Sequence, residues 1–295
     1  MKTVEIPEDL CGTQHVYLPS KLDAAYRELF VVTREKLPSM KLSKFFPMCG
    51  KYYGEKLQWS RNTPCESLDS ASEEEQKKYL EPAVNLMVVG RSTNGWDEFD
   101  ETDSRDFLAA ATEKLIAGQG FSWLDDKGKA RETYDVNGKV RRYSINRSAF
   151  FRSIRKILKE LKPITQKYDR WFENFVWNNL YPISPYEGGN AKGILQDAQL
   201  ETSKKLLIRQ IEYYKPTHIL FITDWDYWFD RFADVFPEVR KTGDRVKDNV
   251  VGYGVYNNIK VVVTIRPDRT SPNKPNEDEF ARDVVKCFDD IQLVD

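Results

Sequence analysis

The feature that most constrains the fold is an apolar run that changes abruptly into small polar residues, at positions 84–96 (VNLMVVGRSTNGW). Two valines end the run and Gly90 follows them. Parallel α/β folds build ligand sites where a buried strand ends at a glycine turn, because the backbone N–H groups after the turn are free to bind a polar ligand. We therefore predict a first strand at 84–89 and a turn that begins at Gly90.

Three more apolar segments predict strands, and they alternate with segments of helical periodicity. The predicted strands are at 175–183, 218–223 and 258–265, and the predicted helices at 20–36, 146–161, 195–214 and 276–288. An aromatic helix at 225–236 is also predicted, with its rings in the core rather than beneath a base. Alternation of this kind is typical of α/β proteins. The predicted fold is a four-stranded parallel sheet flanked by helices.

The segments outside this alternation predict the domain organisation. Residues 1–80 show no strong period and are expected to form an N-terminal extension that packs on the core. Residues 81–295 are expected to form the α/β domain, with an insertion at about 97–143 that contains a hairpin around Asn137-Gly138. The basic and aromatic stretch 41–61 suits either a lid over the core or contact with single strands and flipped bases.

Composition excludes some classes of protein and leaves others open. The net charge of the 295 residues is −1, which does not indicate a nucleic-acid partner, although a neutral total can hide a basic face. The sequence has no apolar run long enough to span a bilayer, and its polar first ten residues do not resemble a signal peptide, so a cytoplasmic location is expected. The four cysteines form no Cys-x-x-Cys pair and there are two histidines, so we expect no metal, iron–sulfur cluster or other cofactor.

Ligands of parallel sheets bind beyond the carboxyl ends of the strands. In this chain those ends are 90–96, 178–185, 223–225 and 266–271, and they carry polar residues beside glycines and prolines. The sequence lacks the dinucleotide-binding glycine motif, the Walker loop, the serine elbow and the zinc-protease motif. Their absence disfavours dehydrogenases, kinases, elbow hydrolases and metalloproteases.

In order and spacing, residues 84–290 resemble the uracil-DNA glycosylase superfamily. In that family the first strand ends in a glycine motif that positions water, and 90–95 (GRSTNG) is the counterpart. The family's second strand ends with a base-reading Asn and a proline loop, which 177–185 (WNNLYPISP) and the following Gly189-Asn190 resemble. Lys215-Pro216 precedes the third strand as in the family, and Arg266-Pro267, followed by Ser271, stands where the family has His-Pro-Ser.

The sequence also departs from the family pattern. Ser92 and Thr93 stand in the first turn, where the common branches carry Asp, Glu or Asn, and Arg266 replaces the histidine. The cysteine spacings do not match the iron–sulfur branches. The resemblance therefore implies a divergent bacterial member that acts on a modified base.

That resemblance implies a metal-independent DNA glycosylase, which flips a base out of DNA, hydrolyses its N-glycosidic bond and leaves an abasic site. Some bacterial relatives remove hypermodified cytosine from phage DNA, so antiviral defence is one expected role. Asn94, or else Asp97, would orient the water, and Arg266 would meet the departing base with a fixed positive charge. Asn179, or its rival Asn178, would read the base edge, because an amide offers both a donor and an acceptor.

The remaining candidates surround these residues. The base pocket would include Gly90, Arg91, Ser92, Trp96 and Tyr181; Trp96, Tyr181 and Phe150 are candidates for stacking; and Arg269, Ser271 and Lys274 would contact DNA. Structural alternatives are a turn role for Asn94, an ion pair of Arg266 with an acid such as Asp268, and a link between two loops for Asn179.

Two other functions remain open from the sequence. One is a non-catalytic protein on the same fold that binds a modified base or a nucleotide, and the other is a hydrolase of free nucleosides or nucleotides. For the leading function we expect a monomer whose partner is DNA.

Overall fold

The computed structural model describes residues 20–43, 48–49, 85–92, 98–99, 133–134, 140–141, 145–161, 175–186, 188–242, 249–267 and 276–293 of the chain. No helix within these ranges has the length and apolar character that a bilayer crossing requires.

A seven-stranded mixed sheet lies at the centre, in the order β10-β11-β12-β9-β3-β7-β2. Its strands are β2 Met48–Cys49, β3 Leu86–Ser92, β7 Val176–Tyr181, β9 His218–Ile222, β10 Arg240–Lys241, β11 Val250–Tyr256 and β12 Ile259–Thr264. The inner strands β12, β9, β3 and β7 are mutually parallel and are the four strands that the sequence predicts. Antiparallel strands extend both edges, so the prediction of a four-stranded, purely parallel sheet is wrong.

The largest strand missing from the prediction is β11, which contains two glycines that weaken its apolar pattern. A Cβ at Gly252 would lie 2.3 Å from the Trp225 ring, and a Cβ at Gly254 would lie 2.3 Å from the Glu238 carbonyl oxygen. Both glycines therefore permit close approach of other segments. The hairpin to β12 turns at Asn257 and Asn258, whose φ angles of 46° and 65° suit a tight two-residue turn. This Asn-Asn pair is the sequence signal that could have predicted the hairpin.

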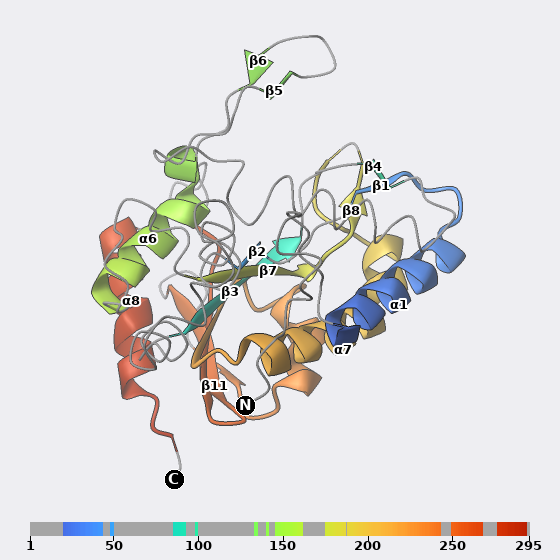
Figure 1. Ribbon diagram of the computed structural model, residues 1–295. Coiled ribbons are helices and arrows are strands. Elements are labelled where there is room, and N and C mark those ends of the chain that lie inside the picture. Colours follow the sequence, from blue (N-terminus) through green and yellow to red (C-terminus); the bar gives the residue numbers. More distant parts are fainter. Residues whose placement is uncertain are drawn as a thin grey trace, which may run out of the picture.

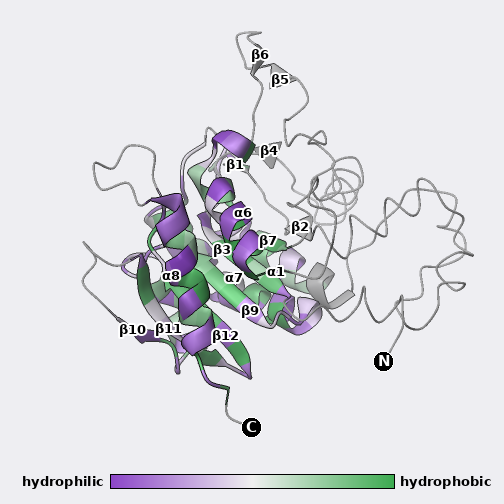
Figure 2. Ribbon diagram, turned by 90° about the vertical axis from the view of Figure 1, so that its left-hand side faces the viewer, coloured by the Kyte–Doolittle hydropathy of each residue, from purple (hydrophilic) through white to green (hydrophobic). Residues whose placement is uncertain are grey.

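Helices cover both faces of the sheet (Figure 1). α1 (Ser20–Lys36) and α7 (Ile194–Tyr214) lie on one side, and α6 (Ala149–Leu161) and α8 (Glu277–Asp290) lie on the other. Along β3, side chains alternate between the two cores: Met87 and Val89 pack towards α7, whereas Leu86 and Val88 pack towards α6 and α8. Burial on both faces explains why apolar residues predominate in the inner strands, and the green of the central sheet in Figure 2 shows this.

Helix α1 belongs to the core that surrounds α7. Tyr26, Leu29 and Phe30 are buried on the face that contacts α7. The Gln210 amide donates a hydrogen bond of 2.9 Å to the Tyr26 hydroxyl, and Lys205 forms an ion pair of 2.6 Å with Glu28. Part of the first 80 residues therefore completes one of the two cores.

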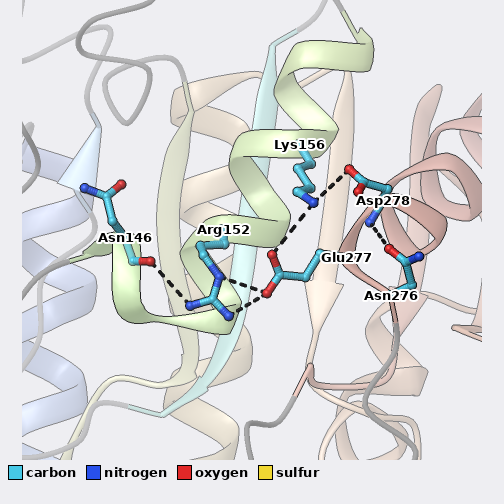
Figure 3. Close-up of polar contacts among 6 residues, drawn as sticks. All are labelled: Asn146, Arg152, Lys156, Asn276, Glu277 and Asp278. Carbon is cyan, nitrogen blue, oxygen red and sulfur yellow. Dashed lines mark hydrogen bonds and ion pairs between the residues drawn. The ribbon is translucent and has the colours of Figure 1, made fainter.

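Charged residues join α6 to the first turn of α8 (Figure 3). Arg152 Nε and Nη2 donate to Glu277 Oε1 at 2.8 and 2.5 Å, and Lys156 Nζ lies 2.7 Å from Asp278 Oδ1. The Asn276 side chain caps the helix by accepting the Asp278 N–H at 3.0 Å. Carboxylates are favourable at a helix N-terminus, so these contacts fix the start of α8. They also pair two cations of α6, Arg152 and Lys156, with carboxylates.

Short elements complete the described structure. β1 Leu42–Ser43, β4 Glu98–Phe99 and β8 Ser184–Pro185 form a small antiparallel sheet. β5 Thr133–Tyr134 pairs antiparallel with β6 Val140–Arg141, so the expected hairpin around 137–138 is confirmed by its pairing. A 3₁₀ turn, Ile145–Arg147, precedes α6.

The aromatic segment after β9 is a turn followed by a 3₁₀ helix, η5 (Phe229–Val235), rather than the predicted α-helix. Its Phe229 and Phe232, and Phe236 after it, are fully buried. The expectation that the rings of this segment lie in the core is confirmed for these three, but it is wrong for Tyr227, which is 77% exposed.

His218 begins β9, and its ring packs edge-on against Phe288, with centroids 4.9 Å apart. Burial, followed by the nearby charge of Lys260, lowers the pKa of His218 from 6.5 to about 4. The unfolded chain therefore takes up a proton first as the pH falls. The stability linked to His218 is complete above pH 6.5 and is lost as the pH falls towards 4.

A test of this assignment compares wild type with His218→Phe in urea unfolding at pH 7 and at pH 5. We expect the free energy of unfolding of wild type to fall by about 1 kcal/mol more than that of the variant, after allowance for solvent screening. Equal losses would contradict this assignment.

Candidate functional site

The tips of β3 and β7 are joined in register, with Gly90 opposite Asn179. β3 continues through Gly90 to Ser92, so the prediction that the strand ends in a turn at Gly90 is wrong. The glycine is required by a close approach instead: a Cβ at Gly90 would lie 2.5 Å from Asn179 Oδ1. Gly90 therefore provides the space in which the Asn179 amide lies.

Asn179 is 5% exposed, and its side chain forms no hydrogen bond with another residue of the described ranges. The donor and the acceptor of this amide are therefore not used by a protein partner of these ranges, and a polar ligand could satisfy both. Asn178, its neighbour, lies on the opposite face of β7, where its amide donates to Gln210 of α7. The structure thus distinguishes the two candidates by face: Asn178 belongs to the α1–α7 core, and Asn179 lies at the tip beside Gly90.

Arg91 links the tips of β3 and β9. Its Nε donates to the Thr223 carbonyl oxygen at 2.9 Å, and its guanidinium forms an ion pair with Asp224. The same guanidinium lies 5.3 Å from the centre of the Trp228 ring. This cation therefore fixes the strand tips through contacts with the protein.

Asp224 also connects these tips to the end of β12. Its N–H donates to the Thr264 carbonyl oxygen at 2.9 Å, and its Oδ1 accepts the Arg266 N–H at 3.4 Å. The prediction did not single out Asp224, although an acid directly after an apolar strand is a recognisable signal. A chain of contacts through Asp224 thus joins Arg91 to Arg266.

The Arg266 side chain is exposed, and its guanidinium has no ion pair with an acid of the described ranges. The alternative partner named from the sequence, Asp268, lies outside those ranges. The backbone of Arg266 is therefore held by Asp224 while its positive charge faces solvent.

Ser92 links the β3 tip to the segment that precedes α7. Its Oγ donates to Asn190 Oδ1 at 3.3 Å and accepts the Ala191 N–H at 3.0 Å. Asn190 belongs to the Gly-Asn pair that carried part of the family resemblance. Ser92 therefore holds two segments of the candidate site together.

Two aromatic candidates for stacking on a base are used in packing. Tyr181 is fully buried, with its ring edge-on to Trp228 and Phe232 at 6.0 and 5.3 Å, and burial raises its pKa to about 12. The expectation that Tyr181 contacts the base is not met, because no face of its ring is exposed. Phe150 packs against Phe151 and Trp177.

The other predicted site residues, Asn94, Trp96, Asp97, Arg269, Ser271 and Lys274, lie outside the described ranges. Within those ranges, no three His, Cys, Asp or Glu side chains are close enough together to hold a metal ion.

The described site therefore consists of Gly90 and Asn179, which lie side by side, and of Arg266 at the end of β12. Asp224 connects Arg266 to β3, because it accepts the Arg266 N–H and forms the ion pair with Arg91. The site offers an amide and a cation at the carboxyl edge of one sheet. No known protein-family model matches the chain, and no curated protein matches it significantly.

Proposed function

We propose that this chain is a DNA glycosylase related to the uracil-DNA glycosylase superfamily, which excises a modified base from DNA without a metal or cofactor. In this proposal it acts in the cytoplasm as a monomer, and defence against phages with hypermodified cytosine is its biological role. The enzyme would extrude the nucleotide, hold its base at the strand tips and hydrolyse the glycosidic bond with water.

The observation that carries the proposal is the Asn179 amide. The residue is 5% exposed, and its side chain makes no hydrogen bond within the described ranges. The amide lies against Gly90, which has no side chain to displace it. An amide donates and accepts along one edge, which is the pattern of a base edge, so a base would satisfy both of its unused groups.

Arg266 supports the chemical step in this proposal. Cleavage of the glycosidic bond leaves negative charge on the departing base, and a fixed cation stabilises such charge without a proton transfer. The exposed guanidinium has no carboxylate partner in the described ranges, so its charge is available to a ligand. Asn94 or Asp97 would orient the attacking water.

The proposal is tested by incubating the purified chain with DNA that contains uracil, damaged bases or phage-modified cytosines. Released bases are identified by mass spectrometry, and abasic sites by alkaline strand cleavage. Free base together with abasic DNA is the expected result. Binding without release would instead support the modified-base-binding protein, and release from free nucleotides alone would support the nucleoside hydrolase.

We expect Arg266→Gln to lower the excision rate by about 100-fold, because it removes one preorganised charge from the leaving group. Its urea midpoint should stay at the wild-type value, since the side chain is exposed and has no ion pair in the described ranges. Arg240→Gln removes the same charge from an exposed site on the edge strand β10 and should excise at the wild-type rate. Equal rates for all three proteins would remove Arg266 from the mechanism.

A further inference from the structure

Tyr227 is a large aromatic side chain that is 77% exposed, in the turn that follows β9. Its φ angle is 67°, in the left-handed region that residues other than glycine seldom adopt. A bulky residue in this conformation is strained by about 1 kcal/mol and persists only where its surroundings enforce it.

The residues around Tyr227 are all held in place. On its N-terminal side, the Trp225 ring packs against the backbone of Gly252, so closely that a Cβ there would be 2.3 Å from the ring. Asp226 Oδ1 lies 2.8 Å from Lys241 Nζ. On its C-terminal side, Trp228 is 9% exposed and its ring lies beneath the Arg91 guanidinium.

The backbone of the turn is closed as well, because the Asp230 N–H donates to the Trp225 carbonyl oxygen at 2.9 Å. A fixed turn thus directs one large ring into solvent. A ring ordered in advance loses little conformational entropy when a ligand stacks on it.

This turn belongs to the candidate site, because it begins at Asp224, which accepts the Arg266 N–H. Both carboxylates of residues 224–228 are ion-paired, Asp224 with Arg91 and Asp226 with Lys241. The positive charge of Arg266 is therefore not offset by an unpaired acid of this turn. Tyr227 and Arg266 follow the carboxyl ends of the neighbouring parallel strands β9 and β12. An exposed ring and an exposed cation at one edge of a sheet are groups that can bind a single nucleic-acid strand through the faces of its bases and its phosphates.

We propose that Tyr227 is a stacking residue, on which a base of the DNA strand next to the extruded nucleotide rests. Its ring would support that neighbouring base while Asn179 holds the target base. The inference rests on the proposed function for the identity of the ligand, but it concerns binding and not the chemical step.

The test measures binding of a fluorescein-labelled single-stranded DNA of mixed sequence by fluorescence anisotropy, at one fixed salt concentration. Tyr227→Leu keeps an apolar side chain but lacks the π face, and we expect its Kd to rise roughly 5- to 100-fold. Tyr227→Phe should bind within about twofold of wild type, since it retains the ring. Tyr253→Leu, at a 45% exposed tyrosine on β11, is the matched control and should bind as wild type does.

Tyr227→Gly separates backbone strain from the contact with DNA. Glycine adopts a positive φ readily, so this variant should unfold at a urea concentration no lower than wild type while binding DNA as weakly as Tyr227→Leu. Weak binding by a fully folded variant would assign the loss to the missing ring.

Base release from the same proteins distinguishes the two proposals. Weaker DNA binding by Tyr227→Leu with no excision by wild type would support the stacking role and overturn the glycosylase. Excision by wild type with unchanged binding by Tyr227→Leu would overturn the stacking role alone. A wild-type protein that binds no DNA would overturn both.

Discussion

Asn179→Ala is expected to reduce base excision by about 10- to 100-fold or more, because a paired donor and acceptor at a base edge contribute about 1–3 kcal/mol. The loss should appear in kcat/KM for the true substrate. Stability should change little, since the Asn179 side chain makes no hydrogen bond within the described ranges. The measurements are the rate of base release and the urea midpoint of the same preparation.

The adjacent residue is a matched control for this variant. Asn178→Ala removes the same side chain one position earlier, from the opposite face of β7, where its partner is Gln210. Because Gln210 is fully buried, losing this partner should destabilise the fold by about 1–3 kcal/mol. Two asparagines with opposite effects, one on excision and one on stability, would support the assignment. A similar loss of excision in both variants would contradict it.

The amide can also be displaced without being removed. In Gly90→Ala the new methyl group would lie 2.5 Å from Asn179 Oδ1, closer than such atoms approach one another. Since the side chain is the part able to move, we expect a folded protein whose excision rate falls as far as that of Asn179→Ala. The double variant should then be no slower than either single one, because both changes remove the same contact.

Asp224→Asn is expected to lower the free energy of unfolding by about 1–3 kcal/mol, because it removes the carboxylate that binds the Arg91 guanidinium. Asparagine preserves the shape of the side chain and tolerates the φ of 67° at this position, so the charge is the property that changes. Both side chains are mostly buried, since Arg91 is 22% exposed and Asp224 is 16% exposed, and this burial limits screening of the ion pair by solvent. Urea unfolding at low and moderate salt measures the effect.

A double-mutant cycle isolates this ion pair. Arg91→Met removes the cation and its contact with the Trp228 ring while keeping an apolar side chain of similar length. If the pair couples the strand tips, the double variant should be about 1–2 kcal/mol more stable than the sum of the two single losses implies. Additive losses would show that Arg91 and Asp224 act independently.

The inner part of the fold could be predicted from the sequence. The four parallel strands are buried on both faces, so each contains an apolar stretch that stands out from its surroundings. The helices α1, α6, α7 and α8 were recognisable from their periodicity within a few residues of their ends. The antiparallel strands could not be predicted in this way. β2 and β10 are only two residues long, and the glycines of β11, which allow other segments to pack closely, interrupt its apolar pattern.

For the candidate site, the sequence by itself determined which strand tips carry polar residues, because the order of apolar runs and breaks is local information. Only the tertiary structure decided how those residues are used. Asn178 and Asn179 are identical in type and adjacent in sequence, yet the pleat of β7 directs one to Gln210 and the other to Gly90. Arg91 and Arg266 are both arginines at strand tips, but a left-handed turn brings Asp224 to the guanidinium of the first and the backbone of the second. These pairings join residues that are tens of positions apart or, for Arg91 and Asp224, more than a hundred, so they depend on how the strands assemble and no local pattern encodes them.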